Sequence, residues 1–325
     1  MNSLKTHFAG LELANPVIIS SCGRTDKPEN NRRLQEAGAA AIVLKSLFEE
    51  NIVRQTQALT DVFAHSEESG SMQGYLRSQM LHEYLDLVRE SKQRCSIPII
   101  ASINCFSNNE WQEFAARIQE AGADALELNV MSIRTSVDYN DGDVEKRHVQ
   151  ILKAVKKCVS IPVTVKLGAN LSNPVNLISR LQACGADGAV LFNRSYKPDI
   201  DIDSMEFTSG YVFSNESDLA EPLRWTGIAS AAVDGIDFAV SGGVRRGEDI
   251  VKSILVGAAA VEVCSVIYQQ GDAWIARALD KVREWQYKNG FSQPDQYRGR
   301  MDASGSENAE RLDRVQFLRY FESQA

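Results

Sequence analysis

The fold of this chain is decided by two apolar stretches that follow each other at residues 161–193, IPVTVKL (161–167) and GADGAVLFN (185–193). The second begins about 23 residues after the first, which leaves room for one helix and two tight turns. The same pairing, an apolar strand followed by a strand that opens with Gly-Ala, occurs three more times. The other pairs are PVIIS (16–20) with GAAAIVLKS (38–46), IPIIASIN (97–104) with GADALELN (122–129), and IDFAVSGG (236–243) with GAAAVEVCS (257–265).

Four such pairs predict eight parallel β-strands with helices between them, an α/β fold of the (β/α)8 TIM-barrel type built from quarter-barrel units. The strands are apolar throughout, as expected for parallel strands covered by helices outside and packed side chains inside. The Gly that opens each second strand stands where a helix C-cap requires a left-handed residue. In barrels of this type the active site lies at the C-terminal ends of the strands.

One barrel needs roughly 250 residues, so the 325 residues of this chain predict a single domain with long loops and a tail. We assign residues 1–290 to the barrel and residues 291–325 to a polar C-terminal tail, in which AERLDRVQFLRYF (309–321) has the pattern of a short amphipathic helix. Three connections are long and leave strands at their C-terminal ends, at residues 46–96, 130–160 and 194–235. We expect each to contain its barrel helix and an insertion that shapes a substrate pocket.

Composition excludes several classes of protein. The net charge of −8 disfavours a nucleic-acid binder, and no apolar run approaches the ~18 residues of a membrane span. The six cysteines form no C-x-x-C pair, none of the four histidines ends a barrel strand, and H-E-x-x-H, G-x-S-x-G and G-x-G-x-x-G are absent. We therefore expect a cytoplasmic protein that acts on a small molecule, without a metal, a nucleic acid or a membrane as partner.

The residues that end the eight strands form a list of candidate site residues. In chain order they are Ser20-Ser21, Lys45-Ser46, Asn104, Asn129, Lys166, Asn193, Gly242-Gly243 and Cys264-Ser265. The glycine turn allows close approach of a phosphate to backbone N–H groups. Lys166 ends an apolar strand, so it is either a snorkelling lysine or a cation placed against developing negative charge. Asn129 and Asn193 either cap their own loops or bind a planar heterocycle.

In this order and spacing, the strand ends and their surroundings resemble the dihydroorotate dehydrogenase family of FMN-binding barrels, from Asn15 to about Gly271. The matching segments are NPVIISSCG, AGAAAIVLKS, SMQGYL, ELNVMS, IPVTVKL, VLFNRS and VSGGVRRGEDIVKSILVGAAAVEVCS. The resemblance implies an FMN dehydrogenase that acts on a CH–CH bond in pyrimidine biosynthesis. It further implies that FMN contacts Ser20, Ser21, Lys45, Ser46, Asn104, Asn129 and Lys166, that its phosphate lies at Gly242, Gly243, Cys264 and Ser265, and that Asn193 faces the substrate.

The match breaks down after the fourth strand. Family members that oxidise dihydroorotate carry Asn-x-Ser-(Cys or Ser)-Pro-Asn there, and this chain has Asn129-Val-Met-Ser132-Ile-Arg134. Ser132 stands at the position of the general base, where it is either the catalyst or an ordinary loop serine, and Arg134 replaces a substrate-binding Asn. A second such Asn aligns with Gly70. Arg194 follows Asn193 where a small hydroxyl residue is usual, so Arg134 or Arg194 would pair a substrate carboxylate.

Four functions stay open at this point. The leading one is an FMN oxidoreductase that moves a hydride between flavin N5 and a small, anionic, cyclic or unsaturated substrate (dihydroorotate, orotate or a relative), with Ser132 and Lys166 as catalytic residues. A tRNA-dihydrouridine synthase would need a basic face and a cysteine after the fourth strand. The others are a non-redox phosphate-binding barrel enzyme and an FMN-binding subunit without dehydrogenase activity. A homodimer is the oligomer that we expect.

Overall fold

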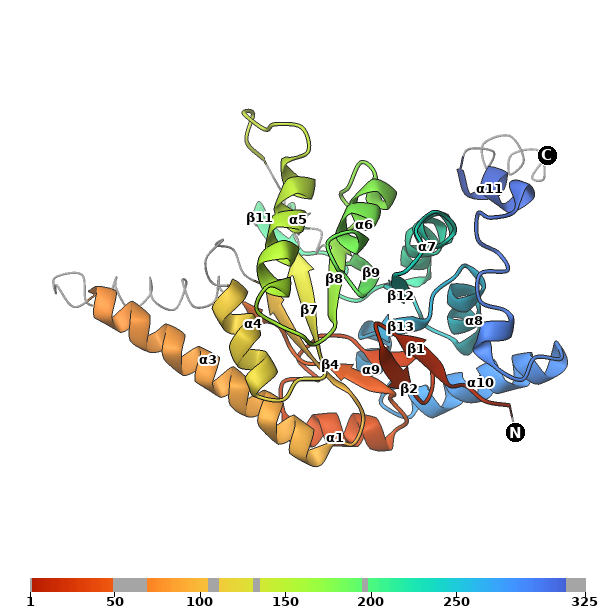
Figure 1. The fold of residues 1–325 in the computed structure, drawn as a ribbon, viewed down its shortest axis with the longest axis horizontal. Coiled ribbons are helices and arrows are strands. Elements are labelled where there is room, and N and C mark those ends of the chain that lie inside the picture. Colours follow the sequence, from red (N-terminus) through yellow and green to blue (C-terminus); the bar gives the residue numbers. More distant parts are fainter. Residues whose placement is uncertain (1, 49–68, 105–110, 131–134, 195–197, 314–325) are drawn as a thin grey trace.

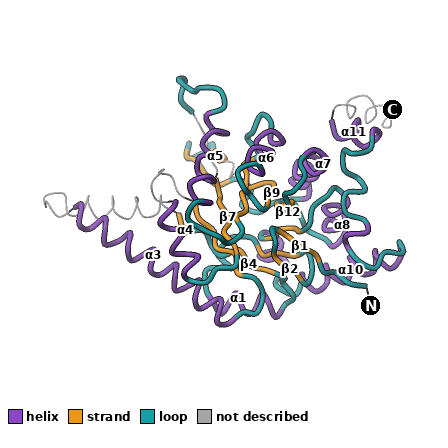
Figure 2. Tube along the Cα trace, viewed as in Figure 1, coloured by secondary structure: helices purple, strands orange, loops and turns teal. Residues whose placement is uncertain are grey.

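The computed structural model describes residues 2–48, 69–104, 111–130, 135–194 and 198–313. Its centre is a parallel sheet closed into a barrel, with helices around the outside (Figures 1 and 2). The barrel strands are β3 (Val17–Ile19), β4 (Ala41–Val43), β6 (Ile99–Asn104), β7 (Ala125–Val130), β8 (Val163–Gly168), β9 (Gly188–Asn193), β12 (Asp237–Ser241) and β13 (Ala260–Val263). They are the eight strands that the sequence predicts, so the TIM-barrel fold is confirmed.

Closure of the barrel comes from pairing between β4 and β6. Ile42 faces Ile99 across this pair, and Ile18 of β3 faces Ala41 of β4, so the first quarter joins the second without a break. A short strand, β5 (Leu47–Phe48), adds to the C-terminal half of β6 through the pair Leu47 and Ile103. Closed pairing leaves the barrel strands no open edge and fixes the relative heights of the strand ends.

The helices lie between the strands as the sequence predicts. They are α1 (Pro28–Glu36), α3 (Ser69–Arg94), α4 (Trp111–Glu120), α5 (Asp143–Lys156), α6 (Pro174–Gln182), α7 (Ala220–Ala232), α8 (Gly247–Leu255), α9 (Ser265–Gln270) and α10 (Trp274–Lys288). Each of the three long connections contains its barrel helix, α3, α5 or α7. The four recurrent glycines have φ from +89° to +109°, so the prediction of left-handed residues at these turns is confirmed.

A hairpin that the sequence analysis missed covers the N-terminal end of the barrel. It consists of β1 (Thr6–Phe8) and β2 (Leu11–Leu13). Phe8 is buried in one cluster with Ile18, Val190 and Ala239 of the barrel interior. The hydroxyl of Thr6 donates a hydrogen bond to the carbonyl of Ala259 over 3.0 Å. The N-terminal end is therefore filled by apolar side chains, which leaves the C-terminal end as the place where the barrel can bind a ligand.

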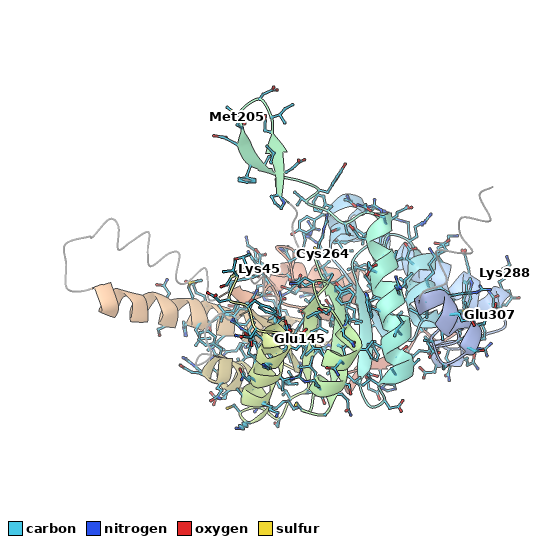
Figure 3. The ribbon with its side chains drawn as sticks, turned by 90° about the horizontal axis from the view of Figure 1, so that it is seen from above. Lys45, Glu145, Met205, Cys264, Lys288 and Glu307 are labelled. Atoms are coloured by element: carbon cyan, nitrogen blue, oxygen red, sulfur yellow. The ribbon has the colours of Figure 1, made fainter. Side chains whose placement is uncertain are left out.

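The insertion after β9 forms a second hairpin, made of β10 (Pro198–Asp201) and β11 (Glu206–Ser209). All eight of these residues are exposed. Figure 3 shows the hairpin projecting from the body of the protein with Met205 near its tip, while Lys45 and Cys264 lie in the central part. The hairpin thus forms no pocket wall by itself, and only the segment after it, at Val212, Phe213 and Ser214, returns to the barrel mouth.

The segment after α10 packs on the barrel. Tyr297 is fully buried and contacts the ring of Trp285, with centroids 5.0 Å apart. The N–H of Ala303 donates to the carbonyl of Gly227 on α7, and helix α11 (Ser306–Asp313) follows. The remainder of the expected tail helix lies outside the described residues, and the division at residue 290 stays a prediction. Within the described part of the chain, no helix is long and apolar enough to cross a bilayer.

Candidate active site

A cavity of about 890 Å³ opens at the C-terminal ends of the barrel strands. It is lined by every candidate residue from the sequence that the structure describes. These residues are Ser20, Ser21, Lys45, Ser46, Asn104, Asn129, Lys166, Asn193, Arg194, Gly242, Gly243, Cys264 and Ser265. The structure thus brings side chains from all eight strands together. Ser132 and Arg134 lie outside the described residues, so their roles as base and substrate ligand stay predictions.

Hydroxyl groups form a chain that leads from one wall of the cavity into the barrel. The Oγ atoms of Ser21 and Ser46 are 2.9 Å apart, and the Oγ atoms of Ser46 and Ser102 are 2.8 Å apart. The backbone N–H of Ser46 donates to Oγ of Ser21 over 2.8 Å. Because a hydroxyl both donates and accepts, this chain can reorient its protons toward a ligand that carries either donors or acceptors.

The floor of the cavity carries a buried ion pair. Nζ of Lys166 lies 2.6 Å from Oε2 of Glu262 and 2.7 Å from Oγ of Ser20. Burial alone would lower the pKa of Lys166, but the carboxylate of Glu262, 2.6 Å away, outweighs this effect and raises it, so the amine stays protonated. Burial raises the pKa of Glu262, but Lys166 and its hydrogen bonds outweigh this effect, so the pKa is lowered and the carboxyl is ionised.

A second buried carboxyl, that of Glu127, lies beside this pair. Its Oε1 is 4.0 Å from Nζ of Lys166, and its side chain is 1% exposed. Burial raises the pKa of Glu127 well above its ordinary value, and the negative charge of Glu262 raises it further. Of the two buried acids, Glu127 is therefore the one that holds its proton to higher pH.

Neither glutamate was among the predicted site residues, because the strands were treated as uniformly apolar, and these two side chains that point into the barrel depart from that pattern. Strand β7 reads Ala125, Glu127, Asn129 on its inward face, and Lys166 on β8 reaches Glu262 on β13, which is not a neighbour of β8. A contact between strands that do not pair must pass through the interior. The alternation in ALELN and AVEVCS was the signal that could have revealed these residues.

The two asparagines of the site contact each other. Nδ2 of Asn193 donates to Oδ1 of Asn129 over 2.8 Å, which orients both amides toward the cavity that they line.

The end of β7 is held by His148 of α5, whose ring nitrogens lie 2.9 Å from the carbonyl oxygen of Val130 and 2.7 Å from that of Val144. Burial lowers the pKa of His148, and the contacts with the carbonyls of Val144 and Val130 offset part of this effect.

The turn after β12 offers backbone donors to the cavity. Gly243 has φ of +74°, and a Cβ at this position would lie 2.2 Å from the backbone nitrogen of Leu219, so only glycine fits. Among the residues that the structure describes, none accepts a hydrogen bond from the N–H of Gly243 or Val244, and both residues line the cavity. Ser265 lies nearby, and its hydroxyl accepts a hydrogen bond from the N–H of Ser214.

Arg194 lines the cavity and also binds a neighbouring segment of the backbone, and its pairing with a substrate carboxylate stays a prediction. Its two terminal nitrogens donate to the carbonyl oxygens of Val212 and Tyr211, over 2.9 Å and 2.5 Å. The guanidinium therefore ties the segment after the exposed hairpin to the end of β9. Lys45, in contrast, has an exposed side chain at the cavity. The structure also adds Arg147 of α5 to the lining, a residue that the sequence analysis did not select.

Two thiols lie at the cavity, on neighbouring strand ends. A hydrogen bond with Cys264 lowers the pKa of Cys22 to about 7, and the same contact and burial raise the pKa of Cys264. Tyr268 lies on this side of the cavity, and its ring contacts that of Phe213 in a tilted arrangement with the centroids 5.6 Å apart. No group of three or more His, Cys, Asp or Glu residues in the described ranges could hold a metal ion.

Comparisons with known proteins agree with this architecture. A family model described as dihydroorotate dehydrogenase matches residues 3–209. The chain is 26% identical over 284 residues to dihydroorotate dehydrogenase B (NAD(+)), catalytic subunit, of Methanocaldococcus jannaschii, covering 86% of this chain and 92% of that protein. It is 30% identical over 287 residues to the protein of the same name from Methanosarcina acetivorans, covering 82% and 86%. The chain therefore belongs to the dihydroorotate dehydrogenase family of oxidoreductases, which act on CH–CH bonds.

Proposed function

We propose that the chain binds FMN noncovalently and transfers a hydride between the flavin and a small, anionic, cyclic or unsaturated substrate. The observation that carries this proposal is one cavity with a protonated lysine at its floor and, at its side, two backbone N–H groups that have no acceptor among the described residues. A fixed cation and fixed N–H dipoles in a buried site favour a ligand with negative charge at two separate places.

The residues present fit FMN. A volume of about 890 Å³ is in the range of cofactor sites, roughly 300–1,000 Å³. The N–H groups of Gly243 and Val244 would hold the phosphate, with Ser265 beside them. The serines of the hydroxyl chain and Asn129 supply donors and acceptors for the polar edge of a flat heterocycle.

When bound, FMN would supply the acceptor or donor of the hydride. Lys166 would stabilise the negative charge that develops during the reaction, since its ammonium is already fixed and desolvated by the barrel. Asn193 would orient the substrate together with Asn129, and Arg194 would contribute those N–H groups that do not bind Val212 and Tyr211. We retain Ser132 as the proposed general base and Arg134 as the proposed partner of a substrate carboxylate.

An absorption spectrum of the purified protein tests this function most directly. The protein should be yellow, its flavin bands should survive desalting, and the released chromophore should be FMN in a 1:1 ratio to the chain. A colourless protein that cannot be reconstituted with FMN would contradict the proposal and favour a phosphate-binding barrel without redox chemistry. A yellow protein whose flavin no dihydropyrimidine or unsaturated acid reduces or oxidises would favour a flavin-binding subunit.

We expect dihydroorotate itself to be a poor substrate. Gly70 and Arg134 replace two amides that would satisfy the polar edge of its ring, and each unsatisfied group costs ~1–3 kcal/mol, so the loss in affinity could exceed a hundredfold. Anaerobic mixing of the oxidised protein with dihydroorotate measures this directly. Rapid bleaching of the flavin at micromolar substrate would contradict the expectation.

A cytoplasmic homodimer is the assembly that we propose, and light scattering of the purified protein tests its mass.

A further inference from the structure

The lysine under the cavity is held from across the barrel. Lys166 belongs to β8. Glu262 belongs to β13 and Ser20 follows β3, two strands that pair with each other but not with β8. Oγ of Ser20 also donates to Oε2 of Glu262 over 3.0 Å, so the three groups form a closed triangle of hydrogen bonds. The side chain of Lys166 is 6% exposed and that of Glu262 is 1% exposed.

Glu127 differs from Glu262 in what surrounds its oxygens. Among the described residues, neither oxygen of Glu127 meets the distance and angle of a full hydrogen bond; its carboxyl interacts with that of Glu262, and Nζ of Lys166 is 4.0 Å away. A buried, ionised carboxylate without a donor is costly, whereas a protonated carboxyl is not. Of the two acids, Glu262 therefore carries the charge. The ammonium, one carboxylate and one neutral carboxyl sum to a net charge of zero beneath the cavity.

We propose that Glu262 is a positioning residue that fixes Lys166 at the floor of the cavity and offsets its positive charge, so that bound FMN accepts electrons less readily than it would above an unpaired lysine. This inference rests on the proposed function for the flavin, but the placement of Lys166 by Glu262 does not. Without Glu262, Lys166 would present an unpaired positive charge to the flavin ring. The 2.6 Å contact with a carboxylate makes the field at the ring weaker.

The apoprotein tests the placement without any cofactor. Lys166→Met leaves Glu262 as a buried carboxylate without its cation, so the midpoint of thermal unfolding should fall by at least about 5 °C. The double variant Lys166→Met/Glu262→Gln should recover at least half of this loss. The matched double variant with Glu127→Gln should recover less, because Glu127 is not the partner of the ammonium. Equal recovery in both double variants, or none in either, would overturn the assignment.

The midpoint potential of the FMN-loaded protein tests the electrostatic role, which a merely structural residue would not affect. Glu262→Gln should raise the affinity for the reduced over the oxidised flavin at least about tenfold, a shift of about +30 mV for two electrons. Glu127→Gln should leave the potential unchanged. The variant lacking both carboxyls should shift at least as far as Glu262→Gln, because Glu127 can then no longer ionise in its place. A negative shift, or an equal shift in Glu127→Gln, would overturn the role.

Failure of the proposed function is distinguishable from failure of this inference. A protein that takes up no FMN would contradict the function, while the unfolding measurements on the apoprotein would still decide whether Glu262 places Lys166.

Discussion

Replacing Gly243 with alanine tests whether the turn after β12 is built for close backbone contact. The backbone at Gly243 has φ of +74°, a left-handed conformation that costs an L-residue about 1–2 kcal/mol. The new Cβ would also lie 2.2 Å from the nitrogen and 2.7 Å from the Cα of Leu219, so the turn or the start of α7 must move by roughly 1 Å. Overpacking of this kind adds about 1–3 kcal/mol, for a total loss of about 2–5 kcal/mol.

Gly290→Ala is the matched control. Its φ of +75° is nearly the same, and nothing lies within 4 Å of the added Cβ, so it isolates the conformational cost of about 1–2 kcal/mol. Guanidinium unfolding of both variants gives the two losses, and FMN titration gives the affinities. We expect Gly243→Ala to be the less stable by at least about 1 kcal/mol and to bind FMN at least about tenfold more weakly, while Gly290→Ala binds normally. Equal stability losses with unchanged FMN affinity would refute this account of the turn.

Three further predictions concern ionisable groups. Because folding raises the pKa of Glu127, the folded state retains a proton that the unfolded state releases above about pH 4.5, so this group makes stability fall as pH rises. The free energy of unfolding of Glu127→Gln, measured in urea relative to wild type, should therefore grow between pH 5 and 7. The expected slope is about 1.4 kcal/mol for each pH unit over which the folded carboxyl keeps its proton. A difference that stays constant with pH would contradict this. Lys166→Ala should slow flavin reduction about 10²-fold or more in stopped-flow measurements while the circular dichroism spectrum is retained; an unchanged rate would make Lys166 structural. Alkylation of Cys22 by iodoacetamide should reach half its maximal rate near pH 7 and shift to higher pH in Cys264→Ala, and a wild-type midpoint near pH 9 would show that the contact with Cys264 has no effect.

The barrel was predictable because its signal is local and repeated. Each strand is a short apolar run, and each second strand follows a helix that ends in glycine, so the eight strands and the helices between them could be assigned from the sequence. The hairpin of β1 and β2 was not found, because strands of three residues carry too little periodicity to separate from a loop. The hairpin of β10 and β11 was treated as an insertion, because its alternating aspartates, exposed on both faces, have no buried side.

The candidate site was predictable to the extent that it lies at strand ends. Parallel strands in a closed barrel bring their C-terminal ends to one face, so Asn129, Lys166 and Gly243 had to meet there even though they are far apart in the sequence. The partners of these residues were not predictable in the same way. Which carbonyl oxygens Arg194 binds depends on where the segment after an exposed hairpin returns, and no local pattern specifies that path.

The two buried carboxyls follow from the repeat itself. Glu127 and Glu262 each stand five residues after the glycine that opens a second strand, Gly122 and Gly257, and these strands are the fourth and the eighth around the barrel. Alternate strands contribute side chains to the same interior layer, so equivalent positions in the repeat bring both carboxyls to one depth of the barrel. Two carboxylates in one buried layer cannot both ionise with a single cation, Lys166, beside them. One of them must keep its proton. Because Lys166 lies 2.6 Å from Glu262 but 4.0 Å from Glu127, the acid that keeps its proton is Glu127.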